Sequence, residues 1–217
     1  TSIVYVTPGG YAKNQDPNLT ATSNKTNDIW LDRFTFPATK PSNATTFSLS
    51  SIGNNAIYYN DADLTIPATG LTYNIANSTI VYVNGNLDIK GRITSTNANG
   101  LLIFIVKGKI TIDPTVGVTG YSTVGGFTTN TVPNIKAGLL SLDTIEFKSN
   151  GKSTDTPIIL QGFIISRKNL AFNRDLGTNN SQYPAHVIKY FVRSIPNIRN
   201  LPVNNGLESY DVQWNYE

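Results

Sequence analysis

The sequence contains no cysteine, no methionine and a single histidine, His186. The absence of cysteine excludes a disulfide framework, thiolate zinc sites and cysteine nucleophiles. With only one histidine, a transition-metal site is also hard to assemble. A Ser-His-Asp triad would need His186, but the chain has no Gly-x-Ser-x-Gly turn that could expose a serine nucleophile. We therefore interpret His186 as a structural or exposed imidazole and predict that the protein is not an enzyme.

Charged residues are also scarce. They make up 14% of the chain, against roughly 25% of an average soluble domain. The net charge is +3, and the lysines and arginines are scattered, without the basic cluster that is typical of nucleic-acid binding. The longest dense apolar runs, residues 101–106 and 157–160, are far shorter than the ~20 residues that span a bilayer. We expect neither a nucleic-acid partner nor a transmembrane segment.

Asparagine and threonine dominate what is present, with 26 of each among 217 residues. Threonine, tyrosine, valine and isoleucine favour strands, whereas asparagine and glycine favour the turns between them. Glutamate is rare, and no stretch is rich in alanine, glutamate and lysine, so helices are disfavoured. The composition predicts an all-β fold. A polar, cysteine-free β protein is typical of an exported chain whose leader has been removed, and we expect an extracellular or cell-surface location.

Three segments of the chain align without gaps when the sequence is shifted by 23 residues. Within each segment apolar and polar residues alternate, which predicts strands with one buried face. Three columns of the alignment are apolar in every segment: Tyr58, Val81 and Phe104; Leu64, Leu87 and Ile110; and Ile66, Ile89 and Ile112. Two segments also share Val83 with Val106, Gly85 with Gly108, and Ile93 with Val116. This repeat predicts a parallel β-solenoid with ~23-residue coils, because stacked coils bury equivalent side chains in ladders.

The alternative fold is a β-sandwich with evenly spaced strands. In the solenoid interpretation, Gly85 and Gly108 mark the same tight corner on successive coils. Gly162, followed by Phe163, repeats that corner after insertions. We predict three segments: a β capping or strand segment over residues 1–50, the solenoid core over 51–172, and a loop-rich C-terminal cap over 173–217.

Both predicted caps contain one regular element. Pro184 suits a first helical turn, and a short helix is predicted over residues 184–191. Near the start of the chain, an uncharged apolar strand is expected at Ile3, Val4, Tyr5 and Val6. An apolar strand with free backbone groups is a template for pairing. It either returns to cover its own first coil or completes the sheet of a neighbouring subunit. These four residues are our candidate partner-binding site.

The stretch Val81-Tyr82-Val83-Asn84-Gly85-Asn86-Leu87-Asp88-Ile89, followed by residues 101–112, resembles the β-helical region of uncharacterised exported bacterial cell-surface proteins of the adhesin or pilus-associated type. The run Asn173-Arg174-Asp175-Leu176-Gly177-Thr178-Asn179-Asn180, with Pro184-Ala185, resembles a motif that follows the last coil in such proteins. The resemblance covers roughly residues 58–195, and the tail beyond it departs from the family pattern. It implies an exported surface protein and no defined activity.

Paired carboxylates are the remaining route to catalysis, because many enzymes that degrade polysaccharides are β-helices and hydrolysis needs two acids. Asp61 and Asp63 lie two residues apart on the outer side of a predicted strand, aligned with Asn84 and Asn86 one coil later and with lysines 107 and 109 two coils later. This column is interpreted as a solvated face, as charges paired across coils, or as oxygen ligands for Ca²⁺. The remaining acids have no supporting motif. The pair Arg174-Asp175 is expected to form a structural Arg–carboxylate bond or a turn cap.

Two functions are compatible with these features. The first is a non-enzymatic extracellular structural or adhesive surface protein, such as a self-assembling filament or surface-layer subunit. The alternative is a carbohydrate-active β-helix that binds or cleaves polysaccharides, with exposed aromatics such as Tyr121, Tyr183 or Tyr210. The expected partners are therefore copies of the chain itself or surface glycans, and no cofactor is assigned.

Overall fold

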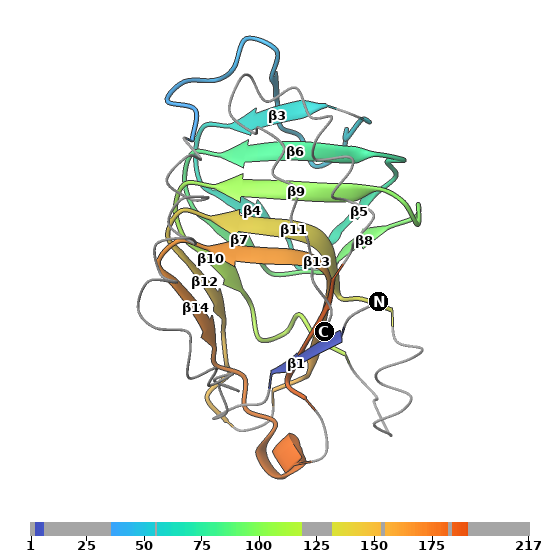
Figure 1. Ribbon diagram of the computed structural model, residues 1–217, viewed down its shortest axis with the longest axis vertical. Coiled ribbons are helices and arrows are strands. Elements are labelled where there is room, and N and C mark those ends of the chain that lie inside the picture. Colours follow the sequence, from blue (N-terminus) through green and yellow to red (C-terminus); the bar gives the residue numbers. More distant parts are fainter. Residues whose placement is uncertain are drawn as a thin grey trace, which may run out of the picture.

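The chain folds into a right-stacked series of β coils in a computed structural model, which describes residues 3–6, 36–54, 56–118, 132–152, 155–181 and 184–190. Successive coils lie one on another along the long axis, as Figure 1 shows. Two sheets run along this axis, and the strands of each sheet come from successive coils. The architecture is the predicted parallel β-solenoid, so the β-sandwich alternative is wrong.

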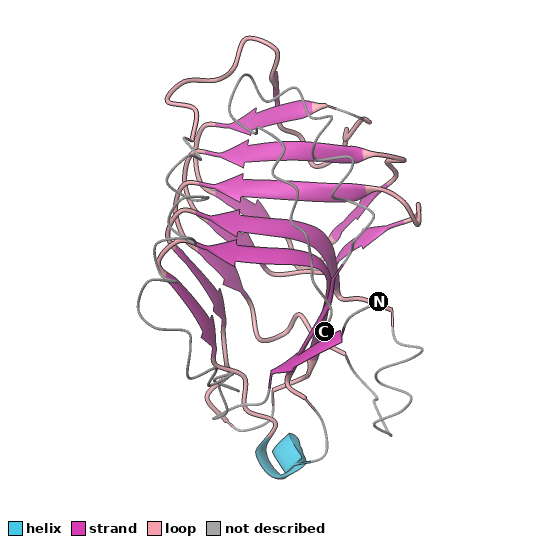
Figure 2. Cartoon of the chain, viewed as in Figure 1, coloured by secondary structure: helices cyan, strands magenta, loops and turns pink. Residues whose placement is uncertain are grey.

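The longer sheet carries the longest strand of each coil. Its parallel strands are β2 (Thr45–Thr46), β3 (Ile57–Asn60), β6 (Ser78–Val83), β9 (Leu101–Val106), β11 (Ile135–Ser141), β13 (Ile158–Ser166) and β15 (His186–Tyr190). The short strands β5 (Leu71–Tyr73) and β8 (Ile93–Ser95) pair with each other, and β8 joins this sheet through β11. Coloured by secondary structure, the described chain is almost entirely strand and loop (Figure 2).

The second sheet has five strands, one from each coil. These are β4 (Leu64–Ile66), β7 (Leu87–Ile89), β10 (Ile110–Ile112), β12 (Thr144–Phe147) and β14 (Asn169–Phe172), and neighbours pair in parallel. In the first strands the outer and inner positions alternate, so that Thr65 is exposed between the buried Leu64 and Ile66. The interior between the two sheets is an apolar core.

The predicted columns are confirmed by the strand register. Tyr58 pairs with Val81, and Val81 pairs with Phe104. The columns that begin with Leu64 and Ile66 likewise continue through the next two coils. The six residues predicted to point inward are each 0% exposed: Val83, Leu87, Ile89, Val106, Ile110 and Ile112. Stacking of equivalent side chains therefore forms the core, as the repeat requires.

Gly85 and Gly108 lie at the same corner of two successive coils. The Gly108 amide donates to the Gly85 carbonyl at 2.9 Å. A Cβ atom on Gly85 would lie 2.6 Å from the Asp63 backbone nitrogen, and one on Gly108 would lie 2.8 Å from the Gly85 carbonyl oxygen. Coils approach so closely here that a side chain on the corner residue would collide with backbone, which explains the glycines.

The spacing changes after the third coil. Gly138 of β11 pairs with Ile103 of β9, 35 residues earlier, whereas Phe163 of β13 pairs with Gly138 at an offset of 25. Gly162 pairs with Ala137 in the middle of a strand, so the prediction that it repeats the Gly108 corner is wrong. The sequence echo misled because two insertions of different length separate the coils.

The third short face also departs from the 23-residue repeat. Ile93 pairs with Leu71 and with Ile135, not with Val116. Leu71 lies 22 residues before Ile93, so this face loses one residue relative to the other two faces. Val116 is buried in the same core but outside any strand. The prediction that Ile93 and Val116 occupy equivalent positions is therefore wrong.

The first coil is covered in part by residues 36–56. Thr45 and Thr46 extend the long sheet beside β3, and the Phe47 ring lies edge-on to Tyr58 and Phe104 at centroid distances of 5.7 and 6.4 Å. This part of the predicted 1–50 segment caps the core as expected. Within the described ranges, no helix is long and apolar enough to cross a membrane.

Candidate functional site

The strand predicted as the partner-binding site lies at the last coil. β1 (Ile3–Val6) runs antiparallel to β15, with Ile3 opposite Lys189 and Val6 opposite His186. Figure 1 shows β1 at the end of the stack that is far from β3. The prediction that this strand covers its own first coil is therefore wrong, because β15 offers an open strand edge at the other end of the solenoid.

β15 occupies the region where a helix was predicted. It pairs in parallel with β13, and Ile159 lies opposite Val187. Ala185, His186 and Val187 are at most 1% exposed, and the segment holds two β-branched residues in succession, Val187-Ile188. Strand pairing and burial outweigh the helix-starting preference of Pro184. The predicted 173–217 cap thus begins with a further rung of the long sheet.

His186 points into the apolar end of the core. Its ring lies edge-on to Phe147 and Phe172 at centroid distances of 5.2 and 4.8 Å. Neither ring nitrogen has a hydrogen-bond partner among the described residues. Burial lowers the pKa of His186 to about 3; the positive charge of Arg174 lowers it further, and Asp155 opposes the shift. His186 is thus a neutral, buried aromatic group under β15.

Arg174 is a fully buried side chain beside this histidine. Its guanidinium donates to the Thr156 carbonyl at 2.6 Å and to the Asp113 carbonyl at 2.9 Å. Burial lowers its pKa to about 10, against the opposing charges of Asp155 and Asp113. Asp113 belongs to the third coil and Thr156 precedes β13, so this one side chain ties together loops from different coils.

Two carboxylates shape the loops around Arg174. Asp155 accepts the amides of Asn150 at 2.7 Å and Asp175 at 2.9 Å. Asp175 accepts the Gly177 amide at 2.8 Å and the Asn180 side-chain amide at 2.6 Å, at the start of the 3-10 helix η1 (Gly177–Ser181). Asp175 is therefore a turn cap, as predicted for the pair Arg174-Asp175.

A second group of polar side chains follows one corner of the solenoid from coil to coil. Asn84 donates to Asp61 at 2.9 Å, and Lys107 donates to Asn84 at 2.9 Å. The parallel row starts at Asp63, which accepts the Asn86 amide at 2.7 Å. We call these contacts the corner ladder; they confirm the interpretation that the Asp61 and Asp63 column pairs charged and polar groups across coils.

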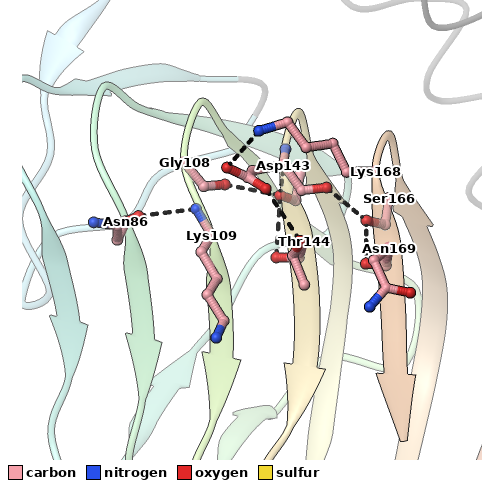
Figure 3. Close-up of polar contacts among 9 residues, drawn as sticks. Asn86, Gly108, Lys109, Asp143, Thr144, Ser166, Lys168 and Asn169 are labelled. Carbon is pink, nitrogen blue, oxygen red and sulfur yellow. Dashed lines mark hydrogen bonds and ion pairs between the residues drawn. The ribbon is translucent and has the colours of Figure 1, made fainter.

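The corner ladder continues into the last coils, and Figure 3 shows its contacts at the starts of the second-sheet strands. Asn86 accepts the Lys109 amide at 2.9 Å, and Lys109 forms an ion pair with Glu146. Lys168 contacts Asp143 at 3.0 Å. Hydrogen bonds from Lys109 lower the pKa of Glu146, and those from Lys168 and Thr144 lower that of Asp143.

These carboxylates are poorly suited to acid catalysis. A glycosidase needs one carboxyl group with a raised pKa beside a second carboxylate. The three carboxyl pKa values with a resolved shift, those of Asp113, Asp143 and Glu146, are all lowered. For Asp113, hydrogen bonds from Thr115 outweigh the opposite effect of burial. Such groups hold the coils together as charged acceptors.

Calcium is not supported by the corner ladder. Asp61 and Asp63 already accept amides of the next coil. In the part of the chain that the structure describes, no three His, Cys, Asp or Glu side chains gather in a way that could hold a metal ion. The oxygen donors present in the column are therefore too few for the six to eight ligands that Ca²⁺ takes.

A cleft of about 420 Å³ opens at the first coil, beside the start of the corner ladder. It is lined by Ala38, Thr39, Lys40, Thr46, Tyr59 and Asp61. Burial, followed by the charge of Asp61, raises the pKa of Tyr59. The aromatic residues suggested for glycan binding, Tyr121, Tyr183 and Tyr210, lie outside the described residues.

Sequence reasoning missed the buried cluster of Arg174, Asp155 and His186. The available signal was Asn173-Arg174-Asp175 directly after a strand in a chain with few charges, which was assigned to turn structure alone. Comparisons with protein-family models, curated proteins and solved structures gave no match to this chain. The resemblance to exported surface proteins accordingly stays a prediction.

Proposed function

We propose that this protein is a non-enzymatic structural or adhesive module of the cell exterior that joins copies of itself through β1. The observation that carries the proposal is the pairing of β1 with β15. Of the strand pairs that the structure describes, this pair alone is antiparallel. β1 is therefore not a rung of the coil but a strand added to its end.

The edge that β1 covers would otherwise be open. β15 pairs with β13 on one side and with β1 on the other. An unpaired edge is a template for any strand of suitable pattern, and strand addition supplies main-chain hydrogen bonds without disulfides. Copies linked in this way would be durable in a chain that has no cysteine.

The chain between β1 and the first coil is long enough for exchange. Residues 7–35 separate β1 from the first described residue of the coil segment. Twenty-nine extended residues reach up to ~100 Å at ~3.3–3.6 Å each. The same strand can thus meet β15 of its own chain or of a neighbour.

The corner ladder and the composition support a structural role outside the cell. Coil-to-coil contacts among Asp, Asn, Lys and Glu side chains stiffen the solenoid along its axis. Asparagine- and threonine-rich β structure without cysteine suits an oxidising exterior. The proposed module is a rigid block with one exchangeable strand.

Engineered cysteines test the proposal, because the chain has none of its own. Val4 lies opposite Ile188, and opposite residues of antiparallel strands bring their Cβ atoms close to disulfide distance. We expect co-expressed Val4→Cys and Ile188→Cys chains to form a disulfide-linked dimer of one chain with the other. The control pairs Val4→Cys with Ile165→Cys, which is 40% exposed and out of register.

Deletion of residues 1–7 provides the second arm. Loss of polymers with an unchanged circular dichroism spectrum would support strand exchange. The proposal is wrong if the full-length chain is monomeric at high concentration and the double variant forms only a disulfide within one chain.

The cleft at the first coil favours a second candidate, a glycan-binding module. Lys40, Tyr59 and Asp61 offer a cation, a ring edge and a carboxylate around one hollow, and polar groups of this kind orient a small ligand. Binding on a glycan array that is lost in Asp61→Asn and kept in Asp113→Asn would favour this function. No binding by the wild-type protein would eliminate it.

A further inference from the structure

The long sheet is apolar on its outer face as well as on its inner face. Side chains alternate between the two faces of a strand, and β6 and β9 are buried at every position. Strands with two apolar faces need a cover on both sides. The outer cluster consists of Ile57, Tyr59, Ile80, Tyr82, Leu101, Ile103 and Ile105, with Leu140 and Phe163 at its border.

The cover of this outer cluster belongs to the same chain. Leu101, Ile103 and Ile105 are 0, 3 and 5% exposed in a single copy. Among the described residues outside the sheet strands, Phe36 and Ala44 pack on the cluster. The Phe36 ring lies 6.3 and 5.7 Å from the rings of Tyr59 and Tyr82, at the first two coils. The part of the cluster on β9 therefore needs a further apolar segment.

We propose that this segment is residues 209–217, docked on the outer cluster through one aromatic face. The sequence there is Ser-Tyr-Asp-Val-Gln-Trp-Asn-Tyr-Glu. Tyr210, Val212, Trp214 and Tyr216 alternate strictly with polar residues, the pattern of an extended segment with one buried face. Its apolar face is rich in aromatic rings, as is the part of the outer cluster formed by Tyr59 and Tyr82.

The distance between the end of β15 and the outer cluster is easily bridged. β15, β13, β11, β9 and β6 are successive neighbours in the long sheet. Four steps of ~4.8 Å separate β15 from β6, or ~19 Å. The 27 residues from 191 to 217 reach up to ~90 Å when extended. The segment can return across the sheet with residues to spare.

Two other segments outside the described ranges are weaker matches. Residues 119–131 are mostly glycine and threonine and present few apolar side chains. Residues 29–34 contain Ile29, Trp30, Leu31 and Phe34, but these do not alternate with polar residues. Their nearness to Phe36 makes them the rival occupant, and the experiment below distinguishes the two.

The two tryptophans of the chain, Trp30 and Trp214, allow a direct test. In the Trp30→Phe variant, Trp214 is the only reporter. We expect its emission to be blue-shifted and its quenching by acrylamide to be several-fold weaker than in the same variant unfolded in urea. In the matched Trp214→Phe variant, Trp30 should be quenched more strongly than Trp214 is in its own variant.

A truncated chain ending at Gly206 provides a second measurement that leaves every described residue unchanged. We expect it to keep its strand signal in circular dichroism and to bind the dye ANS more strongly than the full chain, because the outer cluster is uncovered. Equal ANS binding by the two chains, or full exposure of Trp214, overturns the proposal.

Two more results would assign a different occupant and also overturn the proposal. Protection of Trp30 with exposure of Trp214 would indicate residues 29–34. Protection of Trp214 that disappears on dilution would indicate a second copy. None of these measurements depends on β1, so the proposal stands or falls independently of strand exchange.

Discussion

The second and third coils of the solenoid are held in register differently from the last coil. In the regular coils, β6, β7, β9 and β10 repeat at 23 residues, and equivalent apolar side chains stack on both sides. The last coil follows at offsets of 35 and 25 residues, and its interior contains Arg174 and His186. The same strand types thus surround two kinds of interior.

The difference follows from what lies on each side of a coil. A middle coil has identical neighbours, so its backbone groups pair with coils above and below and its side chains form ladders. At the end of the stack, loops of different length leave buried carbonyl groups without strand partners. The Thr156 and Asp113 carbonyls accept hydrogen bonds from Arg174 instead. A single buried cation there replaces the repeated contacts of the middle.

Removing Arg174 should have the largest effect. Arg174→Ala leaves two buried carbonyls and the nearby Asp155 without their cation, so we expect a loss of about 3–5 kcal/mol in the free energy of unfolding, measured in urea. Arg167, which is exposed, provides the control, and Arg167→Ala should cost less than ~0.5 kcal/mol. Equal losses for the two variants would show that Arg174 does not anchor the last coil.

The next largest effect tests the stacked interior of the middle coils. Ile110 is 0% exposed and is flanked by Leu87 and Ile145 in adjacent strands. Ile110→Ala should cost about 2–5 kcal/mol because it leaves a cavity. Leu170 occupies the same column in the last coil but is only partly buried. Leu170→Ala should therefore cost less, and a larger loss there would contradict the comparison.

The pH dependence of stability should distinguish the last coil. The folded-state pKa of His186, about 3, lies below its ordinary value of 6.5, so the unfolded chain binds more protons between these values. The stability from neutral His186 is complete above pH 6.5 and is lost as the pH falls toward 3. It amounts to about 2 kcal/mol between pH 6.5 and pH 5.

The variant His186→Phe keeps an aromatic ring beside Phe147 and Phe172 but cannot be protonated. Urea unfolding at pH 7, 6 and 5 should show a shallower loss of stability in this variant than in the wild type. The carboxyl groups with lowered pKa values, Asp113, Asp143 and Glu146, titrate in both proteins and cancel in the difference. Parallel curves would show that His186 is not buried in the neutral form.

The smallest effect is expected on the corner ladder. Lys168 has a 66% exposed side chain and contacts a 38% exposed Asp143. Lys168→Ala should cost between about 0 and 1 kcal/mol, because water and salt screen an exposed ion pair. The difference from the wild type should shrink further in 1 M salt. A loss as large as that of Ile110→Ala would mean that the ladder, and not the apolar stack, sets the register.

Much of the fold could be predicted because the repeat is written into the side chains. The column of Leu64, Leu87 and Ile110 predicted which residues face inward and which strands are neighbours. The prediction failed where the repeat is interrupted. Gly162 resembles Gly108 in its neighbours, but strand pairing places it opposite Ala137. No local pattern shows the length of an insertion in space.

The candidate site was predicted only in part. The apolar alternation of residues 3–6 indicated a strand that seeks an edge, and the structure contains that strand. Its partner was not predictable, because β15 lay in a segment with a proline and was expected to be helical. The buried environment of His186 was also missed, since a lone histidine carries no signal of its own burial.

By itself, the sequence determined the solenoid, its 23-residue coils, its inward columns and its glycine corners, since these depend on contacts between residues one coil apart. Tertiary structure alone decided the site of β1, the strand at residues 186–190 and the insertion of Arg174 between loops. These depend on contacts between residues up to about 180 positions apart. The entropy of closing such loops grows only slowly with their length, so chain separation does not select the partner. The open edge and the unpaired carbonyls that form when the last coil is complete select it instead.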